Sequence, residues 1–184
     1  MAQQTQRSVW RDPQTGDPFR ILHFREDRLH RDWGPAVVRV ERTPHGLRPS
    51  HAEWWADGQR TRAAGPAWIA FDTLTGAPKE ERWLRHEDLH RENGPAVVGR
   101  DPRGRITEEW WRNGKAYLPT LPERARWNAT KARQGGPWHR DSTQPLWAQD
   151  LAWQPKEARL GPAGAKRTAA KDPVAKSAGS DLER

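Results

Sequence analysis

The sequence predicts a mainly β protein, an antiparallel meander of about eight short strands built from β-hairpin repeats of about thirty residues. Three observations support this prediction. The stretch over residues 29–38 returns almost unchanged over residues 89–98. A worn copy over residues 60–69 lies between them and keeps one arginine and Gly-Pro-Ala. No segment of residues 1–118 has the apolar period of a helix.

The corner of each repeat is a Gly-Pro dipeptide, at Gly34, Gly65 and Gly94, so the units step by 31 and 29 residues. Glycine tolerates the backbone restriction that the following proline imposes. Proline lacks an N–H and therefore suits the first position of a strand. Valines follow both full copies and favour extended backbone. The predicted strands cover residues 8–11, 19–25, 35–41, 51–56, 66–72, 79–85, 95–100 and 105–112.

Two kinds of turn connect these strands. Asp57-Gly58 and Asn113-Gly114 are strong hairpin signals, because both central residues of a type I′ turn need a positive φ. Glu26-Asp27 and His86-Glu87 hold the same place before their corners. A second recurring glycine marks the turn at the other end of the strands. It occurs at Gly16, Gly46, Gly76 and Gly104.

The residues around each corner are expected to stack as a ladder of turns, one per unit, with each arginine bridging to a carboxylate or carbonyl of the neighbouring unit. His30 with Asp32 has the pattern of a general base, but it recurs as His90 with Glu92, and an active site is rarely tiled. We therefore expect turn bracing and no catalytic residue. The repeat-turn residues are Leu29, His30, Arg31, Gly34, Pro35, Arg62, Gly65, Pro66, Leu89, His90, Arg91, Gly94 and Pro95.

Residues 8–118 resemble the MORN-like repeats of bacterial and phage proteins. The matching residues are the Leu-His-Arg stretches at 29–36 and 89–96, and the Glu-x-Trp-Trp stretches at 53–58 and 109–115. The resemblance implies stacked β-hairpins that serve as interaction modules. Some relatives are described as antitoxin-like, and others occur in phage genomes.

The pattern changes after the repeats. Thr120 and Glu123 have capping-box spacing, which predicts a short helix to about Arg133 that stops at Gly135. We expect three parts: a β-hairpin repeat domain over residues 1–118, a Trp-bearing arm over 119–155, and a flexible tail over 156–184 that is rich in Ala, Lys and Pro.

Tryptophans form the candidate interaction surface. In the pairs Trp54-Trp55 and Trp110-Trp111, strand alternation places one ring inward and one outward. Three interpretations of the outward rings remain open. The C-terminal arm covers them, they form a protein interface, or they stack on nucleic-acid bases. The full set is Trp54, Trp55, Trp83, Trp110, Trp111, Trp138, Trp147 and Trp153.

Composition limits the classes of partner. The net charge is +8, and it is uneven: residues 1–118 hold 20 Lys and Arg against 17 Asp and Glu, whereas residues 119–184 hold 12 against 7. This basic C-terminal third favours an acidic partner. There is no cysteine, no His pair with metal-ligand spacing, no phosphate loop and no apolar run of membrane-spanning length. We expect no metal, cofactor or membrane contact, and a cytoplasmic or virion-associated protein.

These observations favour a non-catalytic protein-binding module, such as a component, inhibitor or antitoxin-type binder of a bacterial or phage assembly. The alternative is a nucleic-acid-binding protein that uses exposed Arg and Trp and the basic tail.

Overall fold

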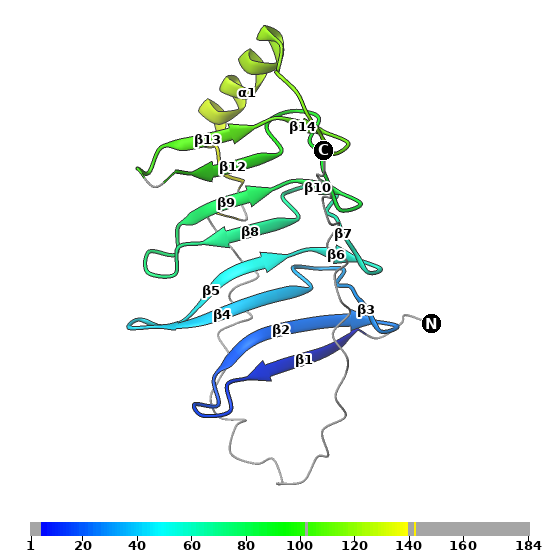
Figure 1. Cartoon of the computed structure of the whole chain (residues 1–184), viewed down its shortest axis with the longest axis vertical. Coiled ribbons are helices and arrows are strands. Elements are labelled where there is room, and N and C mark those ends of the chain that lie inside the picture. The colour runs from blue at the N-terminus through cyan, green and yellow to red at the C-terminus, as the bar shows by residue number, and fades with distance from the viewer. Residues whose placement is uncertain (1–4, 102, 140–141, 143–184) are drawn as a thin grey trace, which may run out of the picture. The chain divides into compact units, whose positions relative to one another are not determined.

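The computed structural model describes residues 5–101, 103–139 and 142, all within the first of the two units into which the chain divides, Met1–Ala152 and Trp153–Arg184. The predicted antiparallel meander is confirmed. Neighbouring strands in the sheet are consecutive long strands of the chain (Figure 1). In order they are β1 (Gln6–Arg11), β2 (Pro18–Arg25), β4 (Val37–Thr43), β5 (Gly46–Glu53), β8 (Trp68–Phe71), β9 (Pro78–Arg82), β12 (Val97–Arg100) and β13 (Ile106–Glu109).

The clusters of buried hydrophobic side chains lie on one face of this sheet. Cross-strand pairing aligns Ile21, Val38, Ala52 and Ile69 in one row, and all four side chains are buried. Successive residues of a strand point to opposite faces, so the neighbours two positions away share this face. Each fully buried aliphatic side chain contributes about 1.5–3 kcal/mol relative to exposure. The row continues through Glu81, which is also fully buried, to Val98 on β12.

Short hairpins branch from the long strands. β3 (Arg28–Leu29) pairs with the end of β2, and three two-stranded ribbons repeat this arrangement. The tip residues have positive φ, which confirms the predicted type I′ turns; they are Glu26 and Asp27, Asp57 and Gly58, His86 and Glu87, and Asn113 and Gly114. The ribbons are β6 (Trp55–Ala56) with β7 (Gln59–Arg60), β10 (Leu84–Arg85) with β11 (Asp88–Leu89), and β14 (Trp111–Arg112) with β15 (Lys115–Ala116).

The strands predicted over 51–56, 79–85 and 105–112 are each split in two, and the break falls on a tryptophan. Trp54 donates its N–H to the carbonyl of Ala67 across the sheet, and its own carbonyl accepts from Thr61 in the hairpin. Trp83 likewise donates its N–H to the carbonyl of Ala96, and its own carbonyl accepts from the N–H of His90. At this residue the backbone leaves one partner strand and joins another. Because pairing was predicted strand by strand, the sequence did not reveal this branch.

Other strand ends differ from the prediction by a few residues. β5 starts at Gly46 rather than at 51, because its first residues pair with β4 as far as Thr43. The strands predicted from the corner prolines begin two residues later, at Val37, Trp68 and Val97. The prolines themselves belong to the corners.

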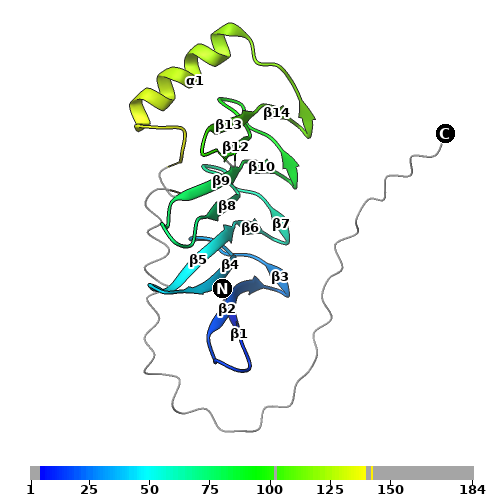
Figure 2. The ribbon, with the colours of Figure 1, turned by 60° about the vertical axis from the view of Figure 1, so that its left-hand side comes forward.

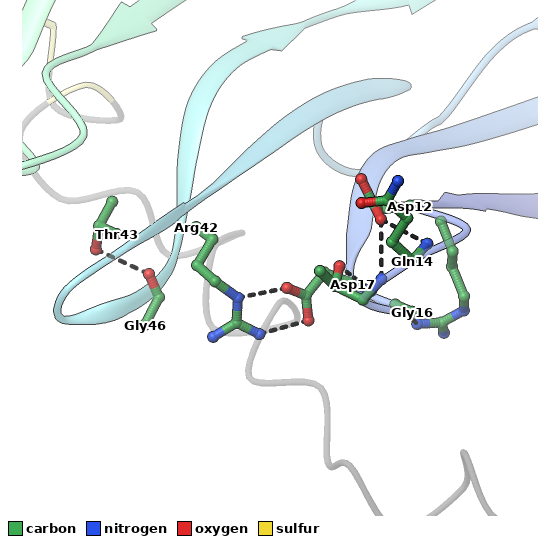
Figure 3. A network of polar contacts seen from close by, with 9 residues as sticks. Asp12, Gln14, Gly16, Asp17, Arg42, Thr43 and Gly46 are labelled. Carbon is green, nitrogen blue, oxygen red and sulfur yellow. Dashed lines mark hydrogen bonds and ion pairs between the residues drawn. The ribbon is translucent and has the colours of Figure 1, made fainter.

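The turns at the ends of the long strands opposite the short hairpins are held by short polar side chains (Figure 3). The carboxylate of Asp12 accepts from the backbone N–H groups of Gln14 and Thr15, which lowers the pKa of Asp12. Arg42, near the end of β4, forms an ion pair with Asp17 beside the first turn, and this contact lowers the pKa of Asp17. The glycines predicted for these turns all have positive φ.

The helix α1 (Leu121–Gln134) follows the last hairpin at the β13 end of the meander (Figure 2). The predicted capping box is confirmed, because Thr120 and Glu123 each accept from the other's backbone N–H. Gly135 ends the helix in the left-handed conformation. Trp127 is the buried residue of the helix, and it packs with Val98, Trp110 and Trp138. Within the described residues, no helix has the length and apolar character needed to cross a membrane.

Candidate interaction surface

An arginine closes each corner and lies against the corner glycine. Its Nη1 donates to the carbonyl of the corner proline four residues later, at 3.4, 3.4 and 3.1 Å for Arg31, Arg62 and Arg91. The three glycines have φ of 103°, 145° and 152°, and a Cβ on any of them would approach the guanidinium to 2.7–3.2 Å. Glycine is therefore needed both for its backbone conformation and for the space it leaves. These acceptors, Pro35, Pro66 and Pro95, lie in the arginine's own corner rather than in the neighbouring unit.

Two of these guanidinium groups also stack on tryptophan rings. Arg62 lies 4.1 Å from the ring centroid of Trp54, and Arg91 lies 3.7 Å from that of Trp83. Arg91 is also 4.7 Å from Trp127 of α1. Burial lowers the pKa of Arg91 to about 10, although Glu81 and Glu108 act in the opposite direction. The corner arginines thus connect the glycine turn to the aromatic core.

The histidine before each of these arginines joins one unit to the next. Nδ1 of His30 accepts from the N–H of Asp57 at 3.1 Å, and Nδ1 of His90 accepts from that of Asn113 at 3.2 Å. Both donors belong to the hairpin turn of the following unit. An accepting Nδ1 carries no proton, so the proton of the neutral ring is on Nε2. With Nδ1 occupied in this way, His30 braces a turn.

Backbone hydrogen bonds flank each histidine contact. Gly58 donates to the carbonyl of Leu29 at 2.9 Å, and Arg31 donates to the carbonyl of Trp55 at 3.3 Å. Gly114 and Arg91 repeat the two bonds with Leu89 and Trp111, at 3.1 and 3.3 Å. The corner of one unit and the hairpin of the next therefore form a ladder, which we call the corner ladder.

The worn middle unit uses a different contact. Thr61 stands where the full copies have histidine. Here the carboxylate of Glu87 reaches back and accepts from the backbone N–H of Arg60, while Nη2 of Arg60 lies 3.3 Å from the same carboxylate. The side chains of His86 and Gln59 add a contact of 2.7 Å. The ladder is thus continuous although one copy has lost its histidine.

The structure separates the tryptophans of the predicted surface. Trp54, Trp110 and Trp138 are buried, and this removes them from the candidate surface. Trp83 is partly buried under Arg91. The outer rings of the pairs, Trp55 and Trp111, are partly buried as well. Their Nε1 groups donate to Glu53 and Glu109 at 3.1 and 3.0 Å. Trp147 and Trp153, like the predicted tail over 156–184, lie outside the described residues.

The most exposed tryptophan of the described chain is Trp33, with 88 % of its surface accessible. It lies in the first corner, between the anchored His30-Arg31 pair and Gly34. The equivalent positions hold Ala64 in the second corner and Asn93 in the third. Sequence reasoning missed Trp33 because it lies inside a repeated motif. The signal that could have found it is this difference between copies at one position.

The face of the sheet opposite the core carries a basic row of two neighbouring arginines. Arg20 on β2 stands directly opposite Arg39 on β4, and His51 on β5 is next in the row. Among the described residues, neither arginine has an ion-pair partner, although Arg20 lies 5.1 Å from the ring centroid of Trp10. Like charges directly opposite each other destabilise a sheet. This basic row therefore suits an anion.

The described residues contain no group of three or more His, Cys, Asp or Glu placed to hold a metal ion. Comparison of the chain with protein-family models, with curated proteins and with solved structures gave no match. The corner ladder, Trp33 and the basic row are therefore the features of the structure that bear on function.

We predict that Gly94→Ala destabilises the protein more than Gly16→Ala does. The new Cβ at position 94 would lie 3.0 Å from the Trp127 ring, whereas at position 16 nothing lies within 4 Å. Both glycines have positive φ, so both variants carry backbone strain. Denaturant unfolding should show losses of about 3 kcal/mol for Gly94→Ala and about 1 kcal/mol for Gly16→Ala. Equal losses would contradict the described packing of the third corner.

We also predict that His51 makes stability depend on pH. Burial, aided by Arg39 and Arg20, lowers its pKa from 6.5 to about 4, even though Glu53 lies 3.6 Å away. Between these two pH values the unfolded chain binds a proton that the folded chain does not. The free energy of unfolding should therefore fall by about 1–2 kcal/mol as the pH drops through this window, after solvent screening. His51→Gln should remove that part of the slope, and an unchanged slope would contradict the assignment.

Proposed function

We propose that this protein is a non-catalytic protein-interaction module whose units are MORN-like repeats, and that it acts as a component, inhibitor or antitoxin-type binder of a bacterial or phage assembly. The observation that carries this proposal is the exposure of Trp33 on a corner of fixed geometry. Tryptophan is enriched among the residues that dominate protein–protein binding energy.

The fold does not require a tryptophan at position 33, because Ala64 and Asn93 fill the same place in the other corners. A tryptophan side chain can remove about 150–250 Å² from water when it is buried by a partner. Leaving that surface 88 % exposed is consistent with a role outside the chain itself.

The backbone on both sides of Trp33 is held before any partner arrives. His30 bonds to the N–H of Asp57 on one side, and Arg31 bonds to the carbonyl of Pro35 across Gly34 on the other. A rigid loop loses little conformational freedom on binding, so more of the contact energy remains as affinity. Arg25 lies 2.7 Å from Asp57 and 3.6 Å from Asp32, and these charges supply a polar rim.

We predict that Trp33→Ala abolishes partner binding and leaves folding intact. Stability should change by less than about 0.5 kcal/mol, because an exposed position is involved and the second corner already has alanine there. The measurement is capture of binding proteins from the native cells with the full chain as bait, followed by the affinity of the purified partner. Leu74→Ala is the matched control, since Leu74 is an exposed apolar turn residue with 67 % accessibility.

The proposal expects a partner that Trp33→Ala loses and that Leu74→Ala retains. If both variants bind the partner with equal affinity, Trp33 is not part of the interface. Failure to recover any stable protein partner, together with measured turnover of a small substrate, would overturn the non-catalytic function.

The second candidate function is nucleic-acid binding, and the specific observation in its favour is the Arg20–Arg39 pair. These two cations face each other across β2 and β4, and no described carboxylate neutralises them. Phosphate groups would relieve their repulsion.

If this alternative holds, the double variant Arg20→Gln with Arg39→Gln should weaken binding and flatten its salt dependence. Loss of two phosphate contacts changes the slope of log affinity against log salt by about 1.4 for a single strand. Filter binding over a range of ionic strength measures that slope. Arg103→Gln with Arg124→Gln, which also removes two exposed charges, is the control. No retention of single- or double-stranded nucleic acid at low salt would eliminate this function.

A further inference from the structure

The two ends of the sheet differ. At the β13 end the chain continues into α1, whose Trp127 packs against Val98 and Trp110. At the other end, within the described residues, β1 is the last strand and pairs on one side only, with β2 (Figure 1). An end strand carries a row of N–H and C=O groups without partners, and such a row can pair with another extended chain.

Val9, in the middle of β1, shows which contact is missing. Its equivalents in the later units are Val38, Ile69 and Val98, which all lie between two paired strands and are fully buried. Val9 stands opposite Ile21 in the same way, but it is only partly buried. A strand on its outer side would complete the arrangement that the other three units already have.

The later units also supply a template for the missing neighbour. The residues of the preceding unit that pair with these equivalents are Ile21, Ala52 and Glu81. Two of the three are apolar. Val9 packs against the buried cluster that contains Ile21, and an aliphatic side chain opposite Val9 would extend this cluster. The incoming strand therefore needs an aliphatic residue at that position.

Arginines flank Val9 on both sides and determine the charge of the incoming strand. Arg7 and Arg11 are exposed, and β1 and β2 together contain four arginines and no Asp or Glu. Two copies of β1 paired antiparallel about Val9 would place Arg7 of one copy opposite Arg11 of the other, and like charges in this position destabilise a sheet. The edge therefore disfavours a second copy of itself and favours an acidic strand.

The backbone of β1 presents its bonding groups on the outer side at the same residues. His23 stands opposite Arg7, yet its N–H bonds to the carbonyl of Ala36, which precedes β4. Because bonded and non-bonded pairs alternate along an antiparallel ladder, the N–H and C=O groups of Arg7 point away from β2. Those of Val9 point the same way, whereas those of Ser8 point toward β2.

We propose that β1 binds an extended acidic segment of the protein partner as an additional antiparallel strand, with an aliphatic residue opposite Val9 and a carboxylate residue opposite Arg7. This inference rests on the proposed function, because it names the chemistry of that partner. Backbone hydrogen bonds to Arg7 and Val9 supply affinity, and side chains at alternate positions supply specificity. The carboxylate adds a charge-assisted bond to the guanidinium.

The test is NMR of the backbone amides of the full chain during titration with the peptide acetyl-Glu-Thr-Val-Thr-Glu-amide. In the free chain the amides of Arg7 and Val9 should exchange rapidly with solvent. The peptide should shift them saturably and slow their exchange. A peptide with Lys in place of both Glu residues should bind about tenfold more weakly. A peptide with Pro in place of Val should not bind, because proline has no N–H to donate to the carbonyl of Val9.

A pair of matched variants locates the binding on β1. Arg7→Glu should weaken binding of the Glu peptide about tenfold and strengthen binding of the Lys peptide, because the charge of the edge is reversed. Arg103→Glu makes the same change at an exposed turn residue between β12 and β13, and it should alter neither affinity.

Absence of a saturable shift, equal binding of the Glu and Lys peptides, or equal effects of the two variants would overturn the proposal. Slow exchange of the Arg7 and Val9 amides in the free monomer would mean that the chain covers its own edge, and slow exchange only in a dimer would make a second copy the occupant. Either result would overturn it as well. The titration does not involve Trp33, so a partner captured through Trp33 together with a failed titration would reject this inference and retain the proposed function.

Discussion

Two of the three corners of the corner ladder depend on a hydrogen bond between a histidine ring nitrogen of one unit and the backbone N–H of the next unit's turn. In the first and third corners this bond measures 3.1 and 3.2 Å. A hairpin of two-residue strands is marginal by itself. Held by this bond and by the flanking backbone bonds, each hairpin becomes part of a row that the sheet supports. The order of the hairpins therefore follows from contacts between successive units.

The arginine beside each histidine converts the turn into a fixed corner. Its guanidinium spans the glycine to the carbonyl of the corner proline, and in two units it also stacks on a buried tryptophan. The turn, the aromatic core and α1 meet at Arg91, which lies against both Trp83 and Trp127. A side chain that projects from such a corner is presented in a defined direction. This is the property that gives Trp33 its proposed role.

The parts of the fold that depend on local backbone chemistry were predictable from the sequence. Type I′ turns, the capping box at Thr120 and the Gly-Pro corners each have a local physical cause, and all are present. Contacts between distant residues were not predictable. The split of each strand at Trp54, Trp83 and Trp110, and the burial of Trp138 against α1, depend on tertiary packing. Trp33 was missed for the opposite reason, since a shared motif hid a position at which all three copies differ.

Amide hydrogen exchange at Asp57 and Asn113 tests the central claim most directly. If the histidine rings join the units, these turn amides should exchange as slowly as amides within β4 and β5, although the turn residues themselves are exposed. His30→Gln should speed exchange at Asp57 and leave Asn113 protected. Exchange of both amides in the unmodified protein at the rate of open turns would contradict the account.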